Sequence, residues 1–191
     1  MSAPQRFTPQ QDGALLGLFE PIEVDLLRLA TAQLLEMLDS GTADPELAAS
    51  DGIFGRLLPD AYRDDEEAAA EFRRYTSINL LERKALNAQM VLNSLHVDIR
   101  ASDLIGKLSA DETDVSAADT EDRQPFTVRL DPDAVQAWLR TLTDLRLTLA
   151  DRLQISPDGV VHLATEDTPF LRELYDWLGM LQEELVYAID I

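Results

Sequence analysis

Four long stretches of this sequence repeat apolar residues every three or four positions, and this spacing restricts the fold more than any other feature. The stretches span residues 22–38, 72–95, 135–153 and 171–185. Apolar residues at this spacing form one stripe along an α-helix, and the stripe must be buried against other elements. We therefore expect a mainly α fold, a bundle of four or more helices with a minor short β element.

Residues that begin or end helices flank these stretches. Pro21 is acceptable in a first helical turn, and Asp39-Ser40-Gly41 predicts the end of the first helix, with Gly41 as its C-terminal cap. The long helix is expected to start near Asp64 or Asp65 and to reach towards Leu108 unless it is broken. Asp131-Pro132 and Asp167-Thr168-Pro169 predict the starts of the last two helices.

Three short segments are candidates for the β element. Gly13–Phe19 is an apolar run that reads as a strand or as the lead-in to the first helix. Phe126–Leu130 alternates apolar and polar residues, and Val160–Leu163 follows a Pro-Asp-Gly turn. The last two could pair with each other in parallel, or each could pair with the Gly13 segment.

The chain is short enough for one helical domain over residues 1–191. Residues 1–12 are polar and contain proline, so we expect a frayed N-terminal arm. Residues 109–125 combine acidic residues with Ser, Thr and Ala, which predicts an acidic mobile linker within the domain. Four apolar residues are expected to pin the connection after the first helix to the core: Phe54, Leu57, Leu58 and Tyr62.

Composition excludes several classes of chemistry. The chain has no cysteine, which removes disulfides, thiolate metal sites and thiol nucleophiles. No apolar run approaches the roughly 18–20 residues that span a bilayer, and the first residues lack the apolar core of a signal peptide. We therefore expect a cytoplasmic protein that does not contact membranes.

The chain is strongly acidic, with 36 Asp and Glu against 16 Lys and Arg and a formal net charge of −20. Because nucleic acids are polyanions, this charge disfavours unaided nucleic-acid binding. The acidity serves solubility on one interpretation, and attraction to a basic partner or mimicry of nucleic acid on the other.

Residues that would build an active site are scarce. His96 and His162 are the only histidines, and neither has the Glu-x-x-His or His-x-x-x-His spacing of metal sites. Gly52-Ile53-Phe54-Gly55 lacks the basic context of an RNA-clamping loop and is interpreted as a turn. The sequence therefore predicts no enzyme, with no catalytic residues, no cofactor and no metal.

One local feature runs against the acidic composition. Arg73, Arg74, Arg83 and Lys84 cluster on the predicted long helix, and Arg73 and Lys84 are close to three turns apart, hence on one face. These side chains either pair within the chain, with Glu71, Glu82 or the acidic linker, or contact a partner. They are our candidate partner-binding residues.

Five segments together resemble a known family. They are Phe54–Tyr62, Glu71–Tyr75, Glu20–Leu27, Leu130–Val135 and Leu174–Leu178. On these segments the chain resembles an actinobacterial family catalogued as a domain of unknown function, the AosR-type oxidative stress transcriptional regulators. The likeness covers nearly the whole chain, apart from the N-terminal arm and the acidic linker.

The resemblance implies a regulator of stress-responsive transcription that works with an alternative sigma factor of RNA polymerase. It also implies oxidation sensing by a cysteine pair, which this cysteine-free chain cannot perform. Our leading hypothesis is a non-enzymatic regulatory protein whose partner is a sigma factor or RNA polymerase. The alternatives are a direct DNA-binding regulator that uses the basic face, and a metal- or ligand-dependent enzyme. A homodimer also stays open, because apolar helix seams pack equally well within or between chains.

Overall fold

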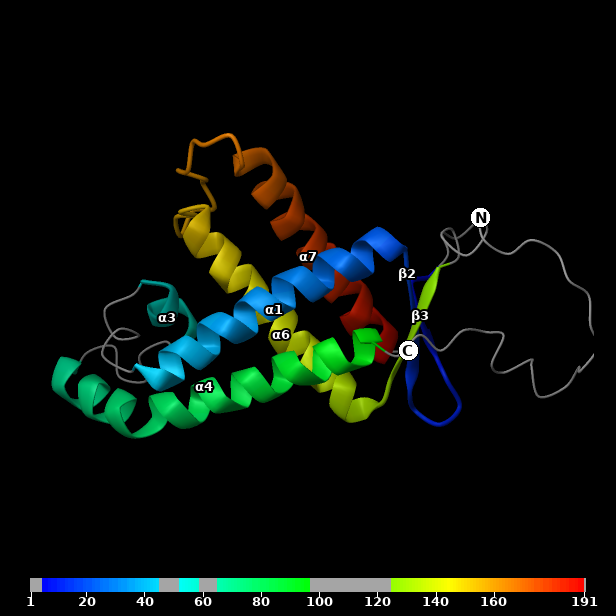
Figure 1. Ribbon diagram of the computed structural model, residues 1–191, viewed down its shortest axis with the longest axis horizontal. Helices are drawn as coiled ribbons and strands as arrows, with labels where there is room; N and C mark the ends of the chain where they lie inside the picture. The colour runs from blue at the N-terminus through cyan, green and yellow to red at the C-terminus, as the bar shows by residue number, and fades with distance from the viewer. Residues whose placement is uncertain (1–4, 45–51, 59–64, 97–124, 191) are drawn as a thin grey trace, which may run out of the picture.

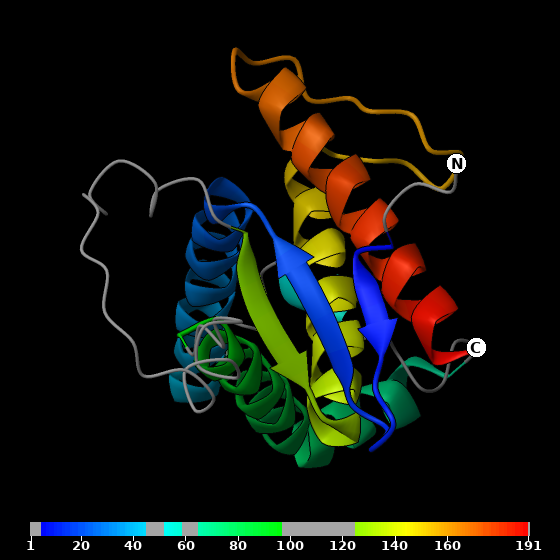
Figure 2. The ribbon, with the colours of Figure 1, turned by 90° about the vertical axis from the view of Figure 1, so that its right-hand side faces the viewer.

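The computed structural model describes residues 5–44, 52–58, 65–96 and 125–190. Within these ranges the chain is mainly α, as predicted: a bundle of helices with a small sheet across one end (Figures 1 and 2). The helices are α1 (Pro21–Ala43), α3 (Gly52–Leu57), α4 (Glu66–His96), α6 (Pro132–Arg152) and α7 (Thr168–Ile189). The strands are β1 (Phe7–Pro9), β2 (Leu15–Phe19) and β3 (Phe126–Leu130).

The sheet has the order β1-β2-β3 with both pairs antiparallel, and Phe126–Leu130 is the strand that the sequence predicted. Gly13, at φ +81°, turns the chain between β1 and β2. The Gly13–Phe19 run is therefore a strand and not part of the first helix.

The prediction of a frayed arm was wrong for Phe7–Pro9. This segment pairs with β2, and Phe7 is buried because its ring packs edge-on against Phe19, with 5.8 Å between ring centroids. Its single buried aromatic anchors a polar segment that has no repeating apolar pattern.

The strand predicted at Val160–Leu163 was also wrong. Val161 forms one isolated bridge to Ile155 around the Gly159 turn, and neither β2 nor β3 pairs with this segment. Val160 and His162 are exposed, so the segment has no apolar face to bury in a sheet.

Most predicted helix starts are confirmed. The Asp131 carboxylate accepts a hydrogen bond from the Ala134 N–H at 2.8 Å, and Asp65 accepts one from Ala68 at 2.9 Å. Helix α7 starts where expected, but the Asp167 side chain makes no capping hydrogen bond.

The first helix ends later than predicted, at Ala43, and Gly41 is not its cap. Gly41 is buried inside the helix, where a Cβ atom would collide with the ring of Phe54 from α3. This glycine therefore allows a close approach of two helices instead of a left-handed turn. Phe54 and Leu57 are buried and pin the connection as predicted, whereas Tyr62 lies outside the described residues.

Helix α6 lies at the centre of the bundle, in contact with α1, α3, α4 and α7. Its Trp138 is fully buried, donates a hydrogen bond to the Ser94 hydroxyl of α4 at 2.9 Å, and packs on Phe19 of the sheet. Trp138 thus joins the helical core to the sheet that closes its end.

The predicted apolar stripe of residues 72–95 is only partly buried. Leu81, Ala88 and Leu95 lie in the core, but Tyr75 and Ile78 are exposed. The acidic linker expected over residues 109–125 falls almost wholly outside the described residues, and the single-domain organisation stays a prediction.

Candidate functional site

The basic cluster predicted to bind a partner is divided by the structure. Lys84 is directed into the bundle, where its Nζ lies 2.6 Å from Oδ1 of Asp144 on α6. Arg83 is exposed. The side chains of Arg73 and Arg74 lie outside the described part of the structure, so a partner contact by the arginines stays a prediction. For Lys84, the alternative of pairing within the chain is the one that the structure supports.

The Lys84 contact stabilises a carboxylate that is almost completely removed from water. Burial raises the pKa of Asp144 above its ordinary value of 3.8, and the hydrogen bond and charge of Lys84 offset only part of that effect. The Lys84 ammonium therefore binds a buried acid 60 residues away in sequence. A partner that binds Lys84 would have to compete with Asp144.

The two histidines lie in ordinary structural settings. His96 Nδ1 is 2.5 Å from the Leu92 carbonyl oxygen, one turn earlier in α4. His162 Nε2 lies 3.2 Å from the Ser156 hydroxyl, which also bonds Asp158 and the Val160 carbonyl. The Asp158 carboxylate bonds the serine and not the histidine, so this group lacks the serine–histidine–acid order of a nucleophilic triad. Among the described residues, no cluster of His, Asp and Glu could hold a metal ion.

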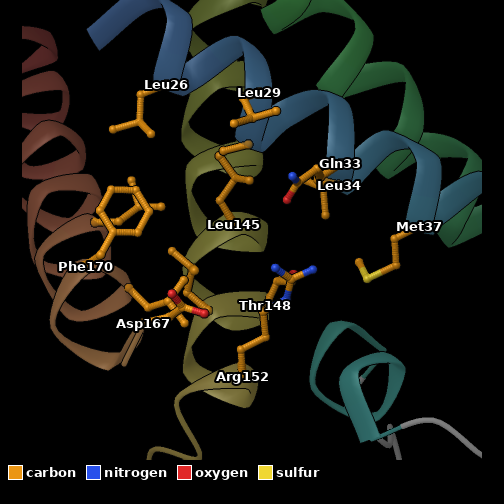
Figure 3. A pocket seen from close by; sticks show the side chains of 14 residues that line it. Leu26, Leu29, Gln33, Leu34, Met37, Leu145, Thr148, Arg152, Asp167 and Phe170 are labelled. Atoms are coloured by element: carbon orange, nitrogen blue, oxygen red, sulfur yellow. The ribbon is translucent and has the colours of Figure 1, made fainter. Parts of the chain in front are cut away.

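The described residues form an apolar groove between α1 and α7, with α6 as its floor (Figure 3). Its volume is about 360 Å³. In this view Leu26 extends from α1 on the side of Phe170 of α7, and Leu29 lies further along α1. Leu29 is 58% exposed and Phe170 is 55% exposed, although both are large apolar side chains. We name this hollow the α1/α7 groove; it is lined by Leu26, Leu29, Ala30, Gln33, Leu34, Met37, Leu145, Thr148, Leu149, Arg152, Asp167, Phe170, Leu171 and Leu174.

Polar interactions join α7 to the beginning of α1 and to the N-terminal segment. Arg6 binds both carboxylate oxygens of Glu23, at 2.7 and 2.9 Å, and its Nε binds Glu184 of α7 at 2.8 Å. The Trp177 side chain of α7 also contributes to lowering the pKa of Glu23. Further from this junction, α1 and α7 both pack against α6 but leave Leu29 and Phe170 exposed. The groove lies between the two helices in this region.

The two walls of the groove are acidic. Helices α1 and α7 each contain four acidic residues and one basic residue. Exposed Asp25 and Glu36 adjoin lining positions of α1, and exposed Glu173 adjoins Leu174 of α7. Arg152 is the basic residue of the lining and comes from the floor helix. An apolar trough between acidic walls suits a ligand that is apolar on one side and basic on its flanks.

Sequence reasoning missed this groove because it assigned Leu26, Leu29 and Met37 to one helix seam. The available signal was the width of the stripe on α1: Ile22 and Leu29 extend the apolar face further than one neighbouring helix can cover. Only the packing of α7 decided which of these side chains stayed exposed.

A family model described as "Domain of unknown function (DUF2017)" matches residues 3–189. The chain belongs to this family. The match runs through the sheet and all the described helices.

Curated relatives bear a more informative name. The oxidative stress regulator AosR of Mycobacterium tuberculosis (strain ATCC 25618 / H37Rv) is 28% identical over 198 residues, which cover 88% of this chain and 79% of the relative. The protein of the same name in Mycobacterium bovis (strain ATCC BAA-935 / AF2122/97) matches equally well, with 28% identity and the same coverage. An AosR protein of Mycobacterium leprae (strain TN) is 28% identical over 181 residues, covering 93% of this chain and 74% of the relative. These names suggest a regulatory role for the family member described here.

No solved structure matches the chain significantly. Within the described residues, no helix is both long and apolar enough to cross a membrane.

Proposed function

We propose that this protein is a non-enzymatic regulator of stress-responsive transcription that acts by binding a sigma factor or RNA polymerase. The observation that most supports a regulatory role is the match along nearly the whole chain to relatives named oxidative stress regulator. The transcription-machinery partner and the non-enzymatic character are our extension of that name.

The α1/α7 groove is the partner site that we propose. A groove with an apolar floor and exposed Leu29 and Phe170 at its walls suits a partner's amphipathic helix, which would lay its apolar face against them. The acidic walls favour lysine and arginine on the flanks of that helix. Basic helices of this kind are expected in proteins that contact nucleic acid, which includes sigma factors and polymerase subunits.

The position of Lys84 favours a protein partner over direct contact with DNA. With its ammonium bound to Asp144, the basic face of α4 loses one of its four cations, while the whole chain keeps a formal charge of −20. Counterion release, which drives nonspecific DNA binding, needs several exposed cations on one face.

Binding to purified actinobacterial core RNA polymerase and alternative sigma factors, measured by biolayer interferometry at about 0.15 M salt, tests the proposal. We expect one of them to bind the wild-type chain. Phe170→Asp and Leu29→Asp should weaken that binding at least tenfold, because each places a charge where an apolar face docks.

Met180→Asp is the matched control, since Met180 is 57% exposed on α7 but does not line the groove. Its affinity should equal that of the wild type. If neither polymerase nor sigma factor binds, the proposed function fails. Binding that Leu29→Asp and Phe170→Asp leave intact would retain the function and eliminate the groove. Binding to duplex DNA alone would favour the DNA-binding alternative.

A further inference from the structure

Helix α4 has apolar residues on two opposite faces. One face is buried against α1 and α6 through Leu81, Ala88 and Leu95. The opposite face exposes large apolar side chains at helical spacing, with Tyr75 68% and Leu86 65% exposed. We name this exposed face the α4 stripe; it contains Tyr75, Ile78, Leu86 and Met90, with Glu82 and Arg83 at its centre.

The charge of α4 differs from that of the groove walls. This helix contains four acidic and four basic residues; with Lys84 directed inward to Asp144, four acidic and three basic residues remain, which is close to balance in a chain of net charge −20. Two copies of an acidic protein repel each other wherever acidic surfaces meet. Helix α4 combines an apolar exposed face with a nearly balanced charge, so it is a surface on which two copies can approach without that repulsion.

The α4 stripe is also symmetric about its own centre. Tyr75 and Met90 are equally distant from the midpoint between Glu82 and Arg83, and the midpoint of Ile78 and Leu86 lies within half a residue of the same point. A two-fold axis through that point, with the helices antiparallel, sets Tyr75 opposite Met90 of the second copy and sets Ile78 within one residue of its Leu86. The same operation sets Glu82 opposite the second copy's Arg83 and Arg83 opposite its Glu82.

We propose that the α4 stripe binds a second copy of this chain, as an antiparallel α4–α4 contact about a two-fold axis between Glu82 and Arg83. A two-fold interface must be self-complementary, because the same patch meets itself in reverse order. The α4 stripe meets this condition in both its apolar residues and its central charge pair. The α1/α7 groove, lined by different helices, stays open in such a dimer, so this inference is independent of the proposed function.

The mass in solution is the first test. Sedimentation equilibrium of the full chain should give twice 21.3 kDa, falling to 21.3 kDa on dilution. Leu86→Glu should give the monomer mass at all concentrations with an unchanged circular dichroism spectrum. Leu29→Glu is the matched control and should remain a dimer, because Leu29 is similarly exposed, at 58% against 65% for Leu86, but lies in the α1/α7 groove.

A charge exchange tests the register even if Leu86→Glu fails to fold. In Glu82→Arg alone, each of the two central charge pairs becomes a pair of arginines. In Arg83→Glu alone, each becomes a pair of glutamates. Each variant should raise the dissociation constant roughly two- to thirtyfold, since two exposed ion pairs are lost. The double variant Glu82→Arg/Arg83→Glu restores both pairs in reverse and should regain the wild-type dissociation constant.

The absence of cysteine permits a crosslinking test without background. Near a two-fold axis a residue lies close to its own copy, so Glu82→Cys should form an intermolecular disulfide under mild oxidation. Leu29→Cys should not. A wild-type chain that is monomeric at about 100 μM, or a dimer that survives Leu86→Glu and does not crosslink at position 82, would overturn the proposal.

Discussion

The Nζ atom of Lys84 lies 2.6 Å from Oδ1 of Asp144, and this ion pair joins α4 to α6 inside the bundle. The Asp144 side chain is 3% exposed and that of Lys84 is 23% exposed. A buried ion pair adds little net stability relative to well-packed apolar residues, but an acid left alone in such a site is costly. Lys84 is therefore interpreted as the residue that makes a buried aspartate tolerable.

Removal of the lysine should destabilise the fold. Lys84→Met leaves the carboxylate without its partner, and we expect the free energy of unfolding to fall by about 3–5 kcal/mol at pH 7. Urea titration followed by circular dichroism measures this change. Arg140→Met, at an exposed position of α6, should stay within about 0.5 kcal/mol of the wild type. A Lys84→Met loss as small as that of Arg140→Met would show that the pair contributes nothing.

Asp144 should also give stability an unusual pH dependence. Its pKa is raised in the folded state, mainly by burial, above the ordinary 3.8. Between these two values the folded chain binds more protons than the unfolded chain, so this residue's contribution to stability falls as pH rises through that window. The free energies of unfolding of the wild type and Asp144→Asn should therefore diverge from about pH 4 upwards, with that of the wild type falling relative to that of the variant. If the free energy of unfolding of the wild type rose relative to that of Asp144→Asn over that range, the raised pKa would be contradicted.

Arg6 should matter beyond its place near the terminus. It binds both carboxylate oxygens of Glu23, so Arg6→Gln should lower the free energy of unfolding by about 1.5–3 kcal/mol at pH 7. Burial alone would raise the pKa of Glu23, but the Arg6 contacts, the hydrogen bond from Glu20 and the Trp177 side chain hold it below the ordinary 4.5.

The sign of the Glu23 effect is opposite to that of Asp144. Its contribution is fully present above pH 4.5 and is lost as pH falls through the lower, folded-state pKa. The difference between wild type and Arg6→Gln in urea titrations should therefore shrink in acid. A difference that stays constant down to pH 2.5 would mean that Glu23 is not the group responsible.

Two glycines should respond oppositely to alanine. Gly41→Ala places a Cβ against the Phe54 ring and should cost about 1–3 kcal/mol, because α1 and α3 must move apart. Gly55→Ala meets open space on α3 and should be neutral or stabilising by up to about 1 kcal/mol. Thermal denaturation of the two variants makes the comparison. Equal melting temperatures would contradict the close approach at Gly41.

Oxidants should separate thiol chemistry from methionine chemistry. Diamide should leave the intact mass and the melting temperature unchanged, because the chain has no cysteine. Hydrogen peroxide should convert Met180, at 57% exposure, to the sulfoxide before Met37, which is partly buried in the α1/α7 groove. Peptide mapping by mass spectrometry gives the order, and prior oxidation of Met37 would contradict the packing described for that groove.

Helix positions were predictable from sequence because their determinants are local. The Asp131 and Asp65 caps bond to N–H groups three residues ahead, and the three-to-four spacing of the leucines repeats within one turn. The short strand β1 was not predictable in this way. Its partner β2 and its neighbour α7 supply the contacts that order it, and neither is visible in a polar segment read alone.

The sequence by itself determined the mainly α class, most helix starts, the acidic charge and the absence of thiol chemistry, because composition and contacts within about four residues specify these properties. The tertiary structure decided three further points: Lys84 meets an acid 60 residues away, Tyr75 and Leu86 lie on the exposed side of α4, and α1 and α7 leave Leu29 and Phe170 uncovered. A helix with apolar residues on both faces has no local preference for which face to bury. The packing of α1 and α6 against α4 determined which face was buried. It thereby determined which surfaces remain exposed to a partner.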